Sequence, residues 1–170
     1  DYSNAPFNIE FYWDDRRDSI SVLEINTRIS KSHCPLFKMV DGEYHHQVMI
    51  DVALGRAPSF PHRQGRFATA AKFMMRLYRD GKVLSIPGPE QVQRVRERFG
   101  GADVQINVTP GMRLFELRDQ DSYSYEVAVL FLGGEDEQDL EARYHRLRNR
   151  LLLEFEPLTD PDDTDQQKTS

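Results

Sequence analysis

The fold is decided by residues 8–28, which read Asn-Ile-Glu-Phe-Tyr-Trp-Asp-Asp-Arg-Arg-Asp-Ser-Ile-Ser-Val-Leu-Glu-Ile-Asn-Thr-Arg. Two hydrophobic runs, 9–13 and 20–25, flank a charged turn at 14–18, and this pattern predicts a β-hairpin. Side chains alternate between the faces of a strand. If the hairpin closes symmetrically around Arg17, Glu10 lies directly opposite Glu24.

Two like charges directly opposite each other destabilise a sheet. A bound divalent cation removes that repulsion, and carboxylate and amide oxygens are ligands that suit Mg²⁺. Asn26 shares a face with Glu24 and offers such an oxygen. The alternative is a hairpin whose acidic face is simply solvated. The spacing of the residues alone leaves both interpretations open.

The bulk composition describes an ordinary globular chain. It has 170 residues, of which 39% are hydrophobic and 29% charged. The net charge of −6 argues against a nucleic-acid or anionic-membrane partner, because such surfaces need clustered Lys and Arg. One cysteine, Cys34, excludes an internal disulfide and a thiolate metal cluster, and it suits a reducing, cytoplasmic setting. No apolar run is long enough to span a membrane.

The rest of the chain predicts a mixture of helices and strands. The first half continues with a loop at 29–35, helices at 36–40 and 43–54, and a Pro- and Gly-rich connector at 56–65 that we take as the boundary between two lobes. The second half predicts the following elements: paired strands at 67–77 and 83–86, a helix at 90–98, strands at 104–108 and 123–132, and a long amphipathic helix at 136–155.

Leu23-Glu-Ile-Asn-Thr-Arg28, which follows an Ile-Glu-Phe strand, resembles the C-terminal metal-binding strands of the ATP-grasp superfamily. The run Val52-Ala-Leu-Gly-Arg-Ala-Pro58 resembles the helix end and Gly-x-x-Pro turn of biotin-carboxylase-type members. The second half, with its Ala-rich strand opening, Pro-Gly turn and closing helix, is similar to the lobe that follows the ATP-grasp fold in those enzymes. The resemblance covers roughly residues 5–155.

This resemblance implies an α+β fold, in which an antiparallel sheet with helices is followed by a small α+β lobe. The implied parts are the C-terminal portion of an ATP-grasp domain at 1–57, the small C-terminal lobe at 64–156, and a disordered polar tail at 157–170.

ATP-grasp ligases bind Mg-ATP and phosphorylate a carboxylate, and an amine or thiol then attacks the acyl phosphate. The resemblance implies that Glu10, Glu24 and Asn26 bind Mg²⁺ or Mn²⁺. It also implies that the Arg28 guanidinium contacts the transferred phosphate or the acyl phosphate. The alternative for Arg28 is a surface ion pair with Asp41 or Glu43.

The segment after Arg28 departs from the family. Biotin carboxylases carry a glutamate there as the base for bicarbonate, whereas this chain has Ser32, so the sequence leaves open whether bicarbonate is used. Lys31 and Ser32 are candidates for binding a carboxylate substrate. His33 is a candidate general base, with an ordinary solvated loop histidine as the alternative. We expect no site at Cys34, or at His45 and His46, which lack partners at helical spacing.

In ATP-grasp proteins the phosphate-covering glycine-rich loop, its lysines and the adenine-binding hinge lie upstream of this region, and this chain has none of them. We therefore expect a C-terminal fragment of a ligase that is inactive alone. Its expected partners are ATP, a small carboxylate and the missing N-terminal lobes of the same chain, with homodimerisation possible and no nucleic acid or membrane. The alternative is a non-catalytic α+β interaction or dimerisation domain that retains the scaffold.

Overall fold

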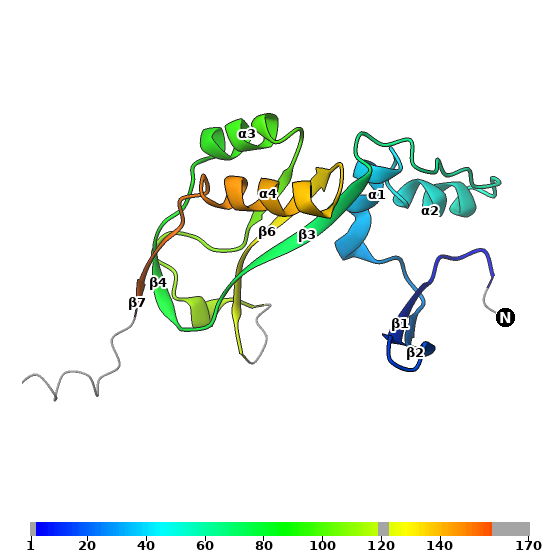
Figure 1. Ribbon diagram of the computed structural model, residues 1–170, viewed down its shortest axis with the longest axis horizontal. Helices are drawn as coiled ribbons and strands as arrows, with labels where there is room; N and C mark the ends of the chain where they lie inside the picture. Colours follow the sequence, from blue (N-terminus) through cyan, green and yellow to red (C-terminus); the bar gives the residue numbers. More distant parts are fainter. Residues whose placement is uncertain (1–2, 119–122, 158–170) are drawn as a thin grey trace, which may run out of the picture. The chain divides into compact units, whose positions relative to one another are not determined.

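The computed structural model describes residues 3–118 and 123–157 (Figure 1). The chain divides into two compact units, Asp1–Ala70 and Ala71–Ser170. The predicted polar tail at 157–170 lies outside the described residues except for Pro157, which ends a strand. None of the described helices is long and apolar enough to cross a membrane.

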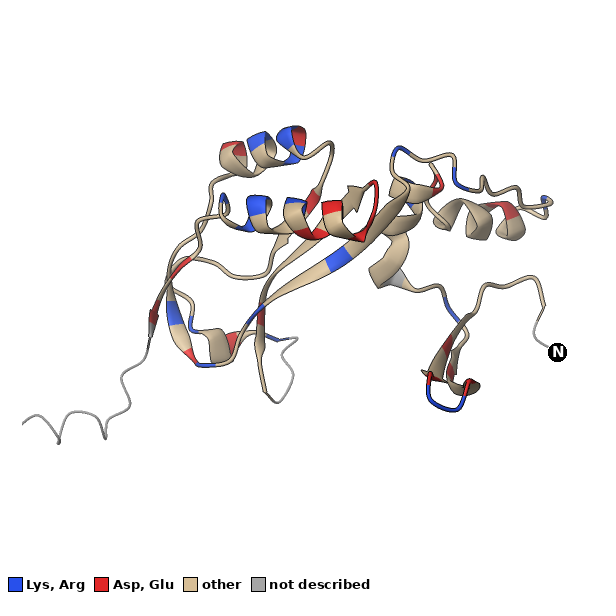
Figure 2. Cartoon of the chain, viewed as in Figure 1, with Lys and Arg blue, Asp and Glu red and all other residues tan. Residues whose placement is uncertain are grey.

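The first unit opens with the predicted hairpin of β1 (Asn8–Asp14) and β2 (Ser19–Asn26), which pair antiparallel. Side-chain hydrogen bonds and one left-handed residue shape its turn. The Asp14 carboxylate accepts hydrogen bonds from the backbone N–H groups of Arg16 and Arg17, at 3.0 and 3.3 Å. Asp18 has a φ of 45°, a left-handed conformation that Asp tolerates better than most residues. Figure 2 shows the charged residues of this turn gathered at the tip of the hairpin.

The register of the hairpin is regular at its open end and shifted near its tip. Asn8 pairs with Asn26 and Glu10 with Glu24, as symmetric closure predicts. The register then shifts between Glu10 and Phe11, because Leu23 is inserted as a bulge. The bulge changes the pairing of the tip only, so the predicted opposition of the two glutamates is confirmed.

Short helices follow the hairpin. A 3₁₀ turn, η1 (Lys31–His33), leads directly into α1 (Cys34–Val40), which therefore begins two residues earlier than predicted. Pro35 fits there because the first turn of a helix needs no N–H from it. The helix ends as predicted at Asp41 and Gly42, whose N–H groups both bond to the Phe37 carbonyl. The next helix is α2 (His46–Ala53).

A close backbone approach ties the connector to α1. The Gly65 N–H donates to the Val40 carbonyl at 2.8 Å, and the Phe67 N–H donates to the Met39 carbonyl at 3.1 Å. A Cβ atom on Gly65 would lie 2.6 Å from the Val40 carbonyl oxygen, well inside van der Waals contact. Glycine is thus required at position 65 by the space available.

The second unit is built on a three-stranded sheet in the order β3 (Thr69–Leu77), β6 (Tyr125–Gly134), β5 (Asp103–Ile106). The prediction that 67–77 and 83–86 pair with each other is wrong. The strand β4 (Gly81–Ser85) pairs instead with β7 (Glu154–Pro157) in a separate ribbon, and β3 pairs with β6.

The predicted helix at 136–155 is also wrong in its second half. The helix α4 covers Glu137–Arg148 only, and the Asp136 carboxylate caps it by accepting from the Asp139 N–H. Beyond it, Leu153 and Phe155 alternate with acidic residues, which is the period of a strand. Both apolar side chains pack against the core beside β4, so burial of this face favours β7 over a longer helix.

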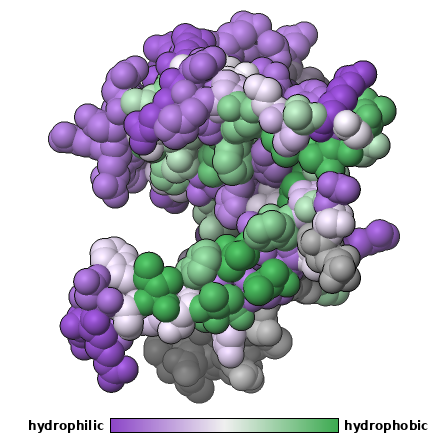
Figure 3. Space-filling model, turned by 90° about the vertical axis from the view of Figure 1, so that its right-hand side faces the viewer, coloured by the Kyte–Doolittle hydropathy of each residue, from purple (hydrophilic) through white to green (hydrophobic). Residues whose placement is uncertain are grey.

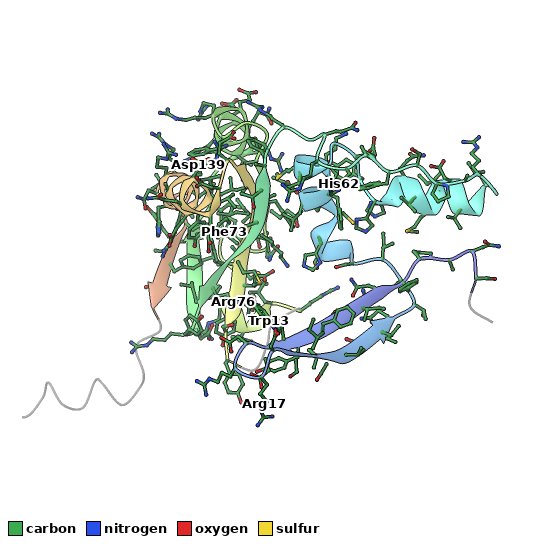
Figure 4. All side chains as sticks on the ribbon, turned by 45° about the vertical axis from the view of Figure 1, so that its right-hand side comes forward. Trp13, Arg17, His62, Phe73, Arg76 and Asp139 are labelled. Carbon is green, nitrogen blue, oxygen red and sulfur yellow. The ribbon has the colours of Figure 1, made fainter. Side chains whose placement is uncertain are left out.

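The main core of this unit lies between the sheet and two helices, α3 (Pro89–Arg98) and α4 (Figure 1). Its buried members are Val95, Phe99, Ala102, Val104, Leu130, Leu132, Leu140, Leu147 and Leu151. Within the side-chain view of Figure 4, Phe73 lies between β3 and α4, where its ring stacks on Tyr144 with centroids 4.3 Å apart. A second, smaller cluster lies around Val83 and Leu114.

We expect Leu147→Ala to destabilise the second unit by about 3 kcal/mol, because its side chain is fully buried and the truncation leaves a cavity. Leu152→Ala is the matched control, since Leu152 is 62% exposed a short distance along the chain. Urea denaturation of both variants measures the difference. Equal unfolding midpoints for the two variants would contradict this packing.

Candidate functional site

Four polar residues gather on one face at the open end of the hairpin. Asn8 pairs with Asn26, and Glu10 pairs with Glu24. Directly paired residues share a face of a sheet, and residues two apart on a strand do so as well. Two carboxylates and two amides therefore lie together, at the end opposite the charged tip marked by Arg17 in Figure 4. Asn8 was not predicted as a member of this group.

The side-chain oxygens at this site are of the kind that bind a hard divalent cation. None of the ion pairs among the described residues involves Glu10 or Glu24, so their mutual repulsion is not relieved by a basic side chain. Asn26 would offer its amide oxygen to a cation, whereas its buried Nδ2 atom has no hydrogen-bond partner in the described structure and can donate to an acceptor oxygen. Carboxylate and amide oxygens are the ligands that Mg²⁺ takes from proteins.

The described residues contain no group of three or more His, Cys, Asp and Glu side chains placed to hold a metal ion. The hairpin supplies two carboxylates and amide oxygens only. This number still suits Mg²⁺, which is usually bound by one or two carboxylates and completes its octahedron with waters and substrate phosphate oxygens. The face therefore offers oxygen ligands from one side only and does not form a closed cage.

Arg28 lies beyond the end of β2, and its guanidinium donates to the neighbouring carbonyl of Ile29 at 3.3 Å. Among the ion pairs of the described residues, none joins Arg28 to Asp41 or Glu43, the alternative partners that the sequence offered. Those two carboxylates lie beside other groups: the backbone N–H of Arg63, which donates to Asp41, and the Lys38 ammonium, 3.8 Å from Glu43. The exposed Arg28 guanidinium thus keeps donors for an anionic ligand.

The predicted substrate-binding segment forms the 3₁₀ turn before α1. Ser32 and His33 are both exposed there, and the His33 Nδ1 atom lies 2.6 Å from the Ser30 hydroxyl. That hydrogen bond orients the imidazole ring and leaves Nε2 available. The side chain of Lys31 lies outside the described structure. The roles of all three residues stay predictions.

A thiol–imidazole cluster was missed by the sequence analysis. The buried Cys34 Sγ lies 3.6 Å from the His45 Nε2 atom and 3.5 Å from the His46 Nε2 atom, so α1 and α2 bring together residues that lie 11 and 12 positions apart. Burial raises the pKa of the Cys34 thiol. Burial, and then the nearby His46 and His33, lower the pKa of His45. A raised thiol pKa is the opposite of what an activated thiolate needs, so this cluster is not an activated nucleophile.

This cluster predicts a stability that falls in acid. The pKa of folded His45 lies below the ordinary imidazole value of 6.5, so the unfolded chain binds a proton more readily. The stabilisation that neutral His45 gives to the folded state is present above about pH 6.5 and is lost as the pH falls toward the pKa of His45 in the folded state. Thermal unfolding at pH 7.5 and 5.5 should show that the melting temperature drops with pH, and that the drop is smaller in His45→Gln than in the unsubstituted protein. An unchanged pH dependence in that variant would contradict the assignment.

No protein-family model matches the chain. Comparison of sequences with curated proteins also finds no match. Solved structures do match. The L-amino acid ligase from Bacillus licheniformis superposes on 89% of this chain, with a TM-score of 0.63 and 19% identity. The biotin carboxylase from Campylobacter jejuni, in a β-γ-ATP complex, superposes on 94%, with a TM-score of 0.59 and 18% identity. Both are ATP-grasp proteins.

The chain has the fold of the C-terminal part of an ATP-grasp protein. The Kluyveromyces lactis urea carboxylase gives the same result, with 96% of this chain covered, a TM-score of 0.57 and 18% identity. This chain covers 36% of the ligase chain, 36% of the biotin carboxylase chain and 14% of the urea carboxylase chain. The predicted α+β ATP-grasp fold is thereby confirmed.

Proposed function

We propose that this chain is the metal-binding part of an ATP-dependent ligase that activates a carboxylate as an acyl phosphate and couples it to an amine or thiol. The observation that carries the proposal is the pairing of Glu10 with Glu24, with Asn26 on the same face, in a chain with an ATP-grasp fold. Two unneutralised carboxylates opposite each other destabilise a hairpin. A bound cation gives them a function.

The proposed roles follow from the chemistry of each side chain. Glu10, Glu24 and Asn26 would hold Mg²⁺ or Mn²⁺ through their side-chain oxygens. When bound, the metal neutralises the charge of the ATP phosphates and aligns the group being transferred. Arg28 binds the transferred phosphoryl group through its planar guanidinium. His33 accepts the proton of the attacking nucleophile, and Lys31 and Ser32 bind the carboxylate substrate.

The proposal includes a longer polypeptide. Consecutive side chains of the hairpin strands are exposed, among them Tyr12 at 58% and Trp13 at 64%, so both faces of the hairpin present apolar surface. Figure 3 shows hydrophobic residues in a row beside a hydrophilic tip in the lower part of the view. An isolated two-stranded hairpin is marginally stable, and apolar surface of this kind marks an interface. We infer that further strands and upstream lobes cover it, and that the segment alone turns over no ATP.

The experiment that tests the function uses the full polypeptide carrying this sequence. ADP release is measured with Mg-ATP and a panel of small carboxylic acids, each with and without amines and thiols. We expect ADP release that requires a carboxylate, disappears with EDTA and returns with Mg²⁺ or Mn²⁺. ADP release that is independent of divalent cations would contradict the proposal.

Arg28→Lys should separate charge from geometry. Lysine keeps the positive charge but loses the bidentate fork, so we expect kcat to fall by about 10²-fold while KM for ATP changes little. Arg56→Lys is the matched control, since Arg56 is an exposed arginine far along the chain in the connector. Steady-state kinetics measure both. A kcat for Arg28→Lys equal to that of the control would remove Arg28 from the reaction.

The second candidate function is a non-catalytic interaction or dimerisation domain, and the apolar surface of the hairpin is the observation that favours it. The two functions differ in what the carboxylates do. For an assembly domain, Glu10→Gln with Glu24→Gln relieves repulsion and leaves binding partners unchanged. For a ligase, the same double substitution removes Mg-ATP binding, which calorimetry measures directly.

A further inference from the structure

Two adjoining pockets open in the first unit beside the open end of the hairpin. The larger has a volume of about 430 Å³ and the smaller about 330 Å³. Asn8, Ser30 and Phe37 line both, so the pockets meet at these three residues. Volumes of this size are typical of sites for small organic molecules.

The larger pocket has an apolar wall and a few polar groups. Its wall is formed by Phe7, Ile29, Phe37, Val48, Met49 and Phe60. The Phe37 ring meets the rings of His45 and Phe60 edge to face, with centroids 4.6 and 6.0 Å apart. The polar members are Asn8, Ser30 and His45. An apolar wall with a few fixed polar groups is how proteins bind a ligand that has an apolar body and one polar end.

His45 contributes an unused hydrogen-bonding atom to this wall. Its Nε2 atom lies 3.6 Å from the Cys34 thiol, while its Nδ1 atom is buried and has no hydrogen-bond partner in the described structure. The thiol has one hydrogen and also lies 3.5 Å from the Ser30 carbonyl, so the His45 Nδ1 atom is a donor in one imidazole tautomer and an acceptor in the other. In either tautomer, a buried hydrogen-bonding atom without a partner is costly. A polar atom of a bound ligand would satisfy it.

Asn8 connects the pocket to the carboxylates. It lines both pockets and lies on the same face of β1 as Glu10, two residues away. Two residues of a strand span about 7 Å, so the part of the pocket that Asn8 lines is about that far from the Glu10 backbone. A small ligand with its apolar part in the pocket can therefore reach, past Asn8, the face that carries Glu10 and Glu24.

We propose that the larger pocket binds the apolar side chain of the acid substrate, so that this ligase acts on carboxylic acids bearing an aromatic-sized apolar group. The inference rests on the proposed ligase function for the identity of the reaction. The pocket volume, its aromatic wall and its position at the carboxylate end of the hairpin carry the choice of substrate class. A segment of the protein that fills the pocket is the competing occupant, and the test below distinguishes it.

The test uses the full polypeptide without ATP, with 3-phenylpropionate as the large probe and acetate as the small one. Dissociation constants come from ligand-detected NMR. Val48→Trp fills the pocket, and Ile50→Trp is the matched control, because Ile50 lies on the same helix, is 51% exposed and does not line the pocket. Met49→Ala opens the wall without adding bulk, and thermal unfolding verifies that each variant is folded.

We expect 3-phenylpropionate to bind more tightly than acetate. We also expect Val48→Trp to weaken its binding by about tenfold or more, within the range that apolar groups contribute in such pockets. Met49→Ala should weaken it less, and Ile50→Trp should change it less than about twofold. Failure of 3-phenylpropionate to bind, or binding that is equal in Val48→Trp, overturns the inference and points to a protein segment in the pocket.

The same variants separate this inference from the proposed function. Carboxylate-dependent ADP release that ignores the size of the side chain and the Val48→Trp substitution supports the ligase and overturns the pocket assignment. Probe binding that is lost in Val48→Trp, without ADP release for any carboxylate, overturns the ligase and with it the substrate role of the pocket.

Discussion

Glu24→Gln is expected to abolish ATP turnover in the full polypeptide while leaving the fold intact. The substitution keeps the shape of an exposed side chain and removes its charge. A neutral amide binds Mg²⁺ far more weakly than a carboxylate, and the metal supplies charge stabilisation to the transferring phosphoryl group. We expect kcat to fall by at least about 10²-fold, the scale on which removing one electrostatic contact acts in such sites.

The control for Glu24→Gln is Asp15→Asn, which removes one exposed carboxylate from the tip of the same hairpin. It changes the net charge equally but lies at the far end from Glu10 and Asn26. Circular dichroism and thermal unfolding verify the fold of both variants. Turnover in Glu24→Gln equal to that in Asp15→Asn would remove Glu24 from the mechanism.

Gly65→Val is expected to destabilise the first unit by about 4 kcal/mol or more, because the added atoms meet backbone that has no room to move. Even a Cβ at this position lies 2.6 Å from the Val40 carbonyl oxygen, and relief would break the bond from the Gly65 N–H to that oxygen. Thermal or urea unfolding measures the loss. Gly88→Ala is the control, since nothing lies within 4 Å of a Cβ there. Equal stability of the two variants would refute the close approach.

Much of the fold follows from local sequence patterns. The wrong predictions concern segments whose structure depends on residues far away in the chain. The hairpin was predictable because its strands and turn are contiguous, and the pairing of Glu10 with Glu24 followed from its length. The bulge at Leu23 has no signal in the hydrophobic pattern. The strands 69–77 and 81–85 are neighbours in sequence, yet each pairs with a strand much later in the chain. In both cases, burial of the apolar faces favours pairing with a distant strand over pairing with the strand next in sequence.

The candidate site divides in the same way. That Glu10, Glu24 and Asn26 share a face was predictable from one stretch of 17 residues, 10–26, because strand alternation and the hairpin register set it. The contact of Cys34 with His45 and His46 was not, because it depends on how two helices pack. The sequence signal for such a cluster is a pair of residues four apart on one helix, and separations of 11 and 12 residues do not match it.

The most direct test of the central claim is a crystal structure of the full polypeptide with Mg²⁺ and a non-hydrolysable ATP analogue. We predict a metal ion bound by Glu10, Glu24 and Asn26 through oxygens at about 2.0–2.1 Å, the distance that Mg²⁺ requires. The ion should also contact phosphate oxygens of the nucleotide. A nucleotide whose metal is held by other residues, with Glu10 and Glu24 facing solvent, would contradict the account.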